Sequence, residues 1–221
     1  MGKKVGITLK MKSKQAKKVK PKLSDDEMLT VLQRRTFTYF LEEANSKTGL
    51  IADKTQPGSP ASIAATGIGL SCYITGVERG FVTRTEAIKK ILTLLKFLHT
   101  SNQSTDPDAT GYKGFYYHFL DMETGKRVWK CELSTIDTAI LLAGILSVRH
   151  YFTEENKSAN LIRNYADELF ARVDWKWALN KKDSISHGWK PESGFLRSRW
   201  NKKYSEAHLI YIMALGSPTF P

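Results

Sequence analysis

The chain has 221 residues, of which 41% are hydrophobic and 25% are charged, a composition typical of a globular domain with a sizeable core. The net charge of +12 comes mostly from nine lysines within residues 1–22, and the rest of the chain is nearly neutral at +3. This distribution argues against a folded domain that binds nucleic acid, so we expect no nucleic-acid partner.

We interpret residues 1–23 as a basic, disordered tail and residues 24–221 as one domain. The tail lacks the apolar run of a secretory signal, and no segment approaches the roughly 20 apolar residues of a membrane span. The chain as given is therefore expected to be soluble and without a signal peptide. A leader lost from the gene model would leave the same pattern, so the localisation stays open.

The cysteines and histidines show no metal-binding pattern. Cys72 and Cys131 lie in apolar segments without metal-ligand spacing, and the five histidines are scattered along the chain. We predict two buried free thiols, no metal and no cofactor.

Three helices are predicted in the first half of the chain. The first covers about 24–44 and starts with a capping box formed by Ser24 and Glu27. The second, about 62–78, is small and apolar nearly all round, which indicates a buried helix. The third, about 83–99, has a second capping box and the amphipathic pattern of a surface helix.

Two loop segments with hairpin signals come before later helices. The first is a loop over 100–113 followed by predicted strands at 114–120 and 126–129. The second, 174–203, is rich in tryptophan, and its first two tryptophans are interpreted as possible core residues.

The remaining helices are predicted from about residue 134 to 146, at 158–173 and at 204–215. Helices one, three and five are amphipathic, whereas helices two, four and six are apolar or small, and a long loop precedes each apolar helix. Alternating outer and inner helices curl into a ring whose loops gather at one end. The predicted fold is all-α, the N-terminal half of an (α/α)6 toroid with small β-hairpins in the loops.

The loops before helices four and six carry the side chains that suit a sugar. Aromatic rings stack on the apolar face of a pyranose, and glycoside cleavage typically needs two carboxyl groups. The candidate catalytic acids are Glu132, Asp137, Glu192 and Glu206. Further candidates for substrate binding in these loops are Tyr117, Trp129, Trp189, Arg199 and Trp200.

These acids also have simpler interpretations. Glu132 could favour the dipole of the following helix, and Glu192 could be an ordinary turn residue. Asp137 and Glu206 lie within or at the start of apolar helices, where an unpaired acid is costly. A function or a buried partner is therefore the better explanation for these two.

The same residues resemble a known family. The matching segments, in order, are QRRTFTYF (33–40), SIAATGIGL (62–70), GVERG (76–80), FYYHFLD (115–121), ELSTIDTA (132–139), SHGW (186–189), PESGF (191–195), YSEA (204–207) and ALGSPT (214–219). They resemble the glucoamylase-like proteins of glycoside hydrolase family 144, which include bacterial endo-β-1,2-glucanases. A related module occurs in cyclic β-1,2-glucan synthases.

The resemblance implies an (α/α)6 toroid that hydrolyses β-linked glucans without a metal. It places the four acids at the family's acidic positions and adds His118 and His187, with Trp189, as pocket residues. Two positions depart from the pattern, because the family usually has an acid at Lys130 and often one at Asn201. Family members also continue for roughly as long again, so the chain is expected to be an N-terminal half only.

We therefore predict a glycoside hydrolase that acts on β-glucan by carboxylate acid/base catalysis. Glu206 or Glu192 is the expected proton donor, and Glu132 and Asp137 are expected to bind sugar or orient water. The alternative is a non-catalytic carbohydrate-binding or assembly fragment, because an open half-ring would expose apolar faces and could self-associate. A third hypothesis is polyanion binding through the basic tail.

Overall fold

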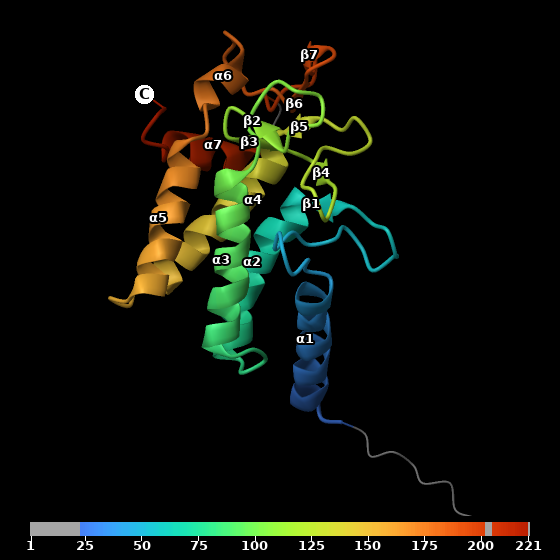
Figure 1. Cartoon of the computed structure of the whole chain (residues 1–221), viewed down its shortest axis with the longest axis vertical. Coiled ribbons are helices and arrows are strands. Elements are labelled where there is room, and N and C mark those ends of the chain that lie inside the picture. The colour runs from blue at the N-terminus through green and yellow to red at the C-terminus, as the bar shows by residue number, and fades with distance from the viewer. Residues whose placement is uncertain (1–22, 202–204, 221) are drawn as a thin grey trace, which may run out of the picture.

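The computed structural model describes residues 23–201 and 205–220. The predicted tail lies almost wholly outside these residues, as does Tyr204 at the predicted start of the last helix. Figure 1 shows α2, α3, α4 and α5 grouped together, with the loops and short strands gathered at one end of the group. The helices are α1 (Asp25–Glu42), α2 (Ile63–Glu78), α3 (Arg84–Thr100), α4 (Thr135–Tyr151), α5 (Lys157–Ala171), α6 (Trp175–Leu179) and α7 (Ala207–Leu215).

The helix predictions are confirmed for most of the chain. Both predicted capping boxes form, at Ser24 with Glu27 and at Thr83 with Glu86. The last helix begins at Ala207, three residues later than predicted. Within the described residues, no helix is both long and apolar enough to span a membrane.

The two inner helices α2 and α4 begin in the same way. Each follows a two-residue strand, and the hydroxyl of the serine that ends this strand, Ser62 or Ser134, caps the helix by accepting a backbone N–H. Four residues later, the hydroxyls of Thr66 and Thr138 each donate to the carbonyl of the capping serine at 2.7 Å. This local repeat fixes where each inner helix leaves the loop end.

Glycines let α2 and α4 pack at very short range. A Cβ atom on Gly144 would lie 2.0 Å from the carbonyl oxygen of Gly67, and one on Gly67 would lie 2.5 Å from the Cα atom of Leu141. No larger residue fits without moving a backbone, which explains the glycine content that the sequence shows in these helices.

The short strands form two antiparallel sheets across the loop end. β1 pairs with β4, and the second sheet has the order β2-β3-β5-β6-β7. The strands are β1 (Ala61–Ser62), β2 (Gly111–Tyr112), β3 (Phe115–Tyr117), β4 (Phe119–Leu120), β5 (Leu133–Ser134), β6 (Gly188–Lys190) and β7 (Gly194–Phe195).

The predicted hairpin of 114–120 with 126–129 forms over its inner residues, where the N–H of Asp121 donates to the carbonyl of Lys126 and the N–H of Val128 donates to the carbonyl of Phe119. Between these segments the only bridge in the described structure joins Leu120 to Arg127. The residues of β3 pair instead with β2 and with β5, because all three of them are buried and the neighbouring strands cover them on both sides. The hairpin expected in 174–203 does form, between β6 and β7.

The short helix α6 was not predicted. Asp174 caps it by accepting the backbone N–H of Trp177 at 2.9 Å, and Asn180 ends it in the left-handed conformation. The ring of Trp175 is buried and contacts Phe115 edge-on, as expected of a core residue. A capping aspartate three residues before a tryptophan is the signal that could have revealed this helix.

The close packing of α2 and α4 makes a stability prediction. Replacing Gly144 with alanine should lower the free energy of unfolding by about 2 kcal/mol, because the added methyl group collides with the backbone of α2. Urea denaturation measures the change. Ser147→Ala on the same helix is the control and should change stability by less than about 0.5 kcal/mol. An alanine at 144 that leaves stability unchanged would contradict this packing.

Candidate active site

A histidine lies between two of the predicted acids where β5 enters α4. The Nδ1 atom of His118 is 3.0 Å from Oε1 of Glu132, and its Nε2 atom is 3.8 Å from Oδ2 of Asp137. The backbone of His118 is fixed as well, since its N–H donates to the carbonyl of Glu132 and its carbonyl accepts the N–H of Ile63. We call His118, Glu132 and Asp137 the acid cluster.

Asp137 is nearly enclosed in the first turn of α4. Its residue exposure is 7%, and the hydroxyl of Ser134 donates to its carboxylate. Burial raises the pKa of Asp137, and this effect exceeds the opposing effects of the Ser134 hydrogen bond and of the charge on His118. Asp137 therefore holds a proton more readily than an exposed aspartate.

The hydrogen bond between His118 and Glu132 shifts both partners toward their charged forms. It raises the pKa of His118, against the effect of burial, and it lowers the pKa of Glu132. Both shifts favour the charged form, as expected for an imidazolium that donates to a carboxylate. Because both side chains remain about one-third exposed, the pair can still contact a ligand.

Glu192 is occupied by an arginine that the sequence analysis did not single out. Its carboxylate accepts two hydrogen bonds from Arg127, at 2.7 and 3.1 Å, and this contact lowers its pKa. Arg127 is buried and also donates to the carbonyl of Cys131 at 2.6 Å. Glu192 thus ties the β6–β7 turn to the segment before β5, and the geometry does not favour it as a proton donor.

Beside the acid cluster, His187 and Trp200 form an aromatic pair. Their rings stack with centroids 3.8 Å apart. The indole N–H of Trp200 donates to the hydroxyl of Thr135 at 3.0 Å, and this hydroxyl lies 2.8 Å from the carbonyl of Ser186. The pair is therefore anchored to the first residue of α4, close to Asp137 in the sequence.

Two of the predicted substrate-binding residues, Tyr117 and Trp189, are buried or partly buried. Tyr117 is fully buried beneath Arg127, so it supports the site and does not face a sugar. Trp189 is partly buried between Tyr112 and Trp177.

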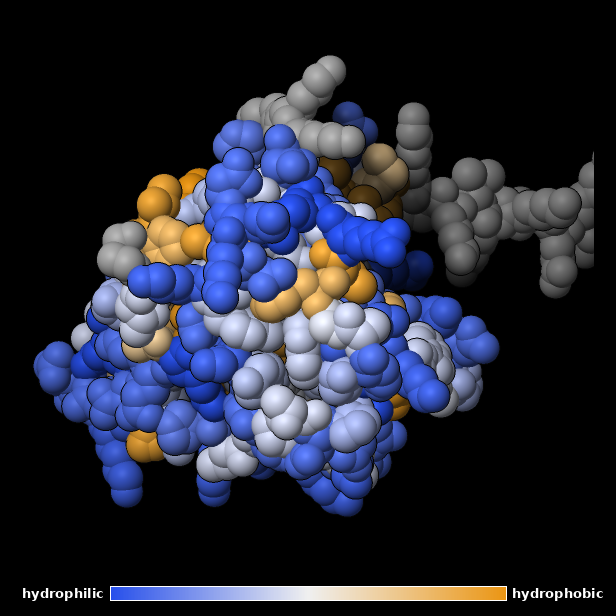
Figure 2. Space-filling view, turned by 90° about the horizontal axis from the view of Figure 1, so that it is seen from above, coloured by the Kyte–Doolittle hydropathy of each residue, from blue (hydrophilic) through white to orange (hydrophobic). Residues whose placement is uncertain are grey.

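Two further predicted residues are accessible. Trp129 is 67% exposed and contacts Phe119, whose ring stacks on His118. Glu206 is exposed at the N-terminal end of α7, without a side-chain capping bond. Viewed from the loop end, the surface is largely hydrophilic with small apolar areas (Figure 2).

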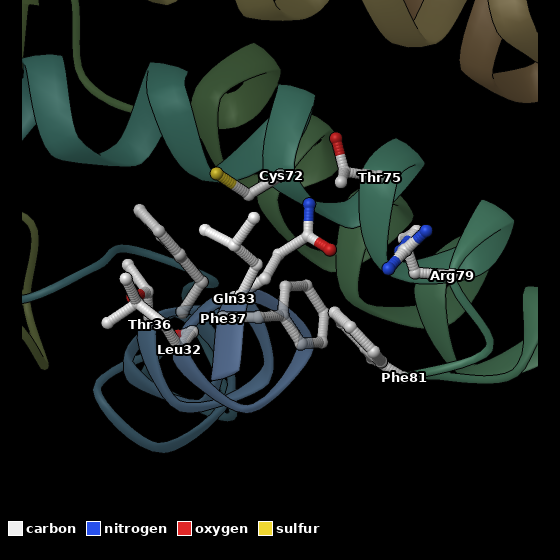
Figure 3. Close-up of a pocket in the computed structure, with 10 residues that line it drawn as sticks. Leu32, Gln33, Thr36, Phe37, Cys72, Thr75, Arg79 and Phe81 are labelled. Atoms are coloured by element: carbon white, nitrogen blue, oxygen red, sulfur yellow. The ribbon is translucent and has the colours of Figure 1, made fainter. Parts of the chain in front are cut away.

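A hollow lies between α1 and α2, away from the acid cluster and from the aromatic pair of His187 and Trp200. It has a volume of about 540 Å³, and Figure 3 shows Leu32, Phe37 and Phe81 around it, with Cys72 on α2. No acid lines it, so it lacks the carboxyl groups that glycoside cleavage needs.

Across residues 23–201 and 205–220, no group of three or more histidine, cysteine or acidic side chains could hold a metal ion. Both cysteines are free, with Cys131 buried and Cys72 partly buried.

Comparisons with known proteins place this site in context. No family model matches the chain. It is 30% identical over 207 residues to an exo β-1,2-glucooligosaccharide sophorohydrolase (non-reducing end) of Parabacteroides distasonis, across 90% of this chain and 28% of that protein. The structure of a candidate glucoamylase from Bacteroides uniformis superposes with a TM-score of 0.80 at 31% identity, over 91% of this chain and 49% of that one.

A β-1,2-glucanase from Parabacteroides distasonis gives a TM-score of 0.77 at 27% identity, over 90% of this chain and 28% of that one. These matches confirm the predicted resemblance and the all-α fold, which forms part of an (α/α)6 toroid with small strands in its loops. The chain spans about half the length of the candidate glucoamylase and less than a third of the curated relative.

The pairing of His118 with Glu132 makes a prediction about titration. Glu132→Gln should lower the pKa of His118 toward its ordinary value of 6.5, because the hydrogen bond to Glu132 is the main cause of its rise. Ring titration of His118 by NMR measures this pKa. Glu155→Gln, which removes an exposed acid paired with Arg163, is the matched control and should leave the titration of His118 unchanged. An unaltered His118 titration in Glu132→Gln would show that the pair does not form.

The same pair predicts how stability depends on pH. Because the pKa of His118 is raised in the folded chain, its charged form adds fully to the free energy of unfolding below pH 6.5. This contribution is lost as the pH rises through the folded pKa. Because the pKa of Glu132 is lowered in the folded chain, its charged form adds fully to the free energy of unfolding above pH 4.5. This contribution is lost as the pH falls through the folded pKa. The stability difference between wild type and Glu132→Gln should therefore be largest from pH 4.5 to 6.5, as measured by urea denaturation. A difference that grows above neutrality would contradict this.

Proposed function

From the premise that this chain is a relative of the glucoamylase-like and β-1,2-glucan-cleaving proteins, we propose that it acts on β-linked glucan as a glycoside hydrolase. The observation that carries the proposal is the acid cluster of His118, Glu132 and Asp137, which opens on the same end of the fold as the aromatic pair. The relatives named above act on β-1,2-glucans or are described as glucoamylases, which supports a glucan as the substrate.

Glu206 is the proposed proton donor. Glu206 is exposed and forms no ion pair within residues 23–201 and 205–220, whereas Glu192 is held by Arg127 and Asp137 is nearly enclosed. It follows Ser205, which lines the same depression as the rings of His187 and Trp200. A sugar stacked on that pair would bring a glycosidic oxygen toward the start of α7.

The acid cluster is proposed to hold the sugar or the attacking water. The ionised Glu132 can accept a hydrogen bond from a hydroxyl group or a water molecule, and the imidazolium of His118 can donate one. Asp137, with its raised pKa, fits a supporting group that keeps the orientation of His118. This division gives the site a proton donor just before α7 and a polar partner near the start of α4, the two-group arrangement that glycoside cleavage typically needs.

The proposed donor makes a kinetic prediction. Glu206→Gln should reduce the cleavage of β-1,2-glucooligosaccharides about 100-fold or more, because the leaving oxygen would lose its proton source. Chromatography of the released sugars measures the rate. Glu123→Gln, an exposed acid that pairs with Lys47, is the control and should cleave like the wild type. Unchanged cleavage by Glu206→Gln would move the donor role to another residue.

A non-catalytic binding or assembly role is the second candidate. It is favoured by apolar side chains that α2 and α7 leave in solvent, with Ile68 48%, Ile212 64% and Leu215 73% exposed. Such side chains commonly mark a surface that another protein or domain covers. Under this hypothesis the purified chain binds β-1,2-glucooligosaccharides without cleaving them and self-associates in light scattering. A monomer that cleaves the glucan would rule it out.

A further inference from the structure

A basic depression lies at the edge of the aromatic pair. It has a volume of about 480 Å³, and the rings of His187 and Trp200 form part of its lining. The rest of the lining comes from the segment Arg197–Asn201 and from Ser205. None of these lining residues is acidic, whereas the acid cluster near the start of α4 carries two carboxyl groups. We call this hollow the arginine depression.

Arg199 is fixed in this depression by neutral groups alone. Its Nη2 atom donates to the carbonyl oxygen of Leu179 at 2.7 Å and to that of Ser184, and its Nε atom donates to the hydroxyl of Ser184 at 3.2 Å. No carboxylate within the described residues forms an ion pair with it, unlike Arg127, which meets Glu192. A partly buried guanidinium without a counter-charge attracts an anion more strongly than one that is already neutralised.

Arg197 adds a second positive charge to the same hollow. It is exposed and, within residues 23–201 and 205–220, forms no ion pair. The backbone on either side is held in place, because the carbonyl of Ser198 accepts the N–H of His187 and the N–H of Trp200 donates to the carbonyl of Ile185. Arg197 can bind the oxygen atoms of a phosphate or a carboxylate with paired hydrogen bonds. The Nη1 atom of Arg199 forms no hydrogen bond within the described residues, so it can add a further donor.

The arginine depression also contains the aromatic rings proposed to contact a sugar, so one ligand could carry both the anion and the sugar. The aromatic pair of His187 and Trp200 lines the same hollow as the two arginines, and Ser205 in its wall is followed by Glu206. We propose that the arginine depression binds an anionic substituent, a phosphate ester or a carboxylate, carried on the β-glucan. The inference rests on the proposed function, since it specifies which glucans the site takes.

The test compares three probes by isothermal titration calorimetry at one ionic strength. They are a β-1,2-glucooligosaccharide, the same oligosaccharide carrying succinyl groups, and inorganic phosphate. The wild-type chain should bind the succinylated sugar about tenfold more tightly than the plain sugar, as expected when a charged group gains hydrogen bonds. Arg197→Gln should remove most of this preference. Arg35→Gln, which neutralises an exposed arginine on α1, is the matched control and should keep it.

The outcomes separate this inference from the function on which it rests. Equal binding of the plain and succinylated sugars would overturn the inference and leave the proposed function standing. A preference that survives in both Arg197→Gln and Arg199→Gln would also overturn it. Phosphate that binds as tightly as the succinylated sugar would assign the depression to a free anion and overturn the link to glucan. No binding of the plain sugar would contradict the proposed function itself.

Discussion

The close contact between α2 and α4 is the constraint on which the rest of the structure depends. Gly67 and Gly144 bring the two inner helices together at backbone range, and the Ser62 and Ser134 caps make both helices begin at the same end. The strands that precede them are therefore drawn into the sheets across that end. A side chain at either glycine would push the inner helices apart and with them the loops that carry the acids.

The site follows from this arrangement. Because β4 pairs with β1, the segment before it holds His118 over the start of α4, where Glu132 and Asp137 are found. The two acids beside His118 have pKa values that move in opposite directions. The hydrogen bond from His118 lowers the pKa of Glu132, while burial raises the pKa of Asp137. Groups whose pKa values move apart in this way are typical of active sites.

Local sequence signals were sufficient for most of the fold. Capping boxes and hydrophobic periodicity located the long helices to within a few residues, because these signals act over one or two turns. Strand pairing was harder to predict, since β4 and a loop separate β3 from its partner β5, and three helices separate β5 from β6. Helix α6, with five residues, is too short to show a period.

The same distinction holds for the site. The residue types and their loops indicated a sugar site, and the motif series indicated the family. The link between Glu192 and Arg127 joins residues 65 positions apart, and no local pattern reveals it. The burial of Tyr117 was hidden for a similar reason, because the residues that cover it come from other loops. Candidate acids can therefore be found from sequence, but their roles depend on long-range partners.

Hydrogen–deuterium exchange with and without a β-1,2-glucooligosaccharide tests the central claim most directly, which is that the loop end around α4 and α7 binds glucan. The account predicts slower exchange of backbone amides in residues 115–137 and 186–207 when the sugar is present. Exchange in α3 and α5 should stay the same. Protection confined to the hollow between α1 and α2, or no protection anywhere, would contradict the account.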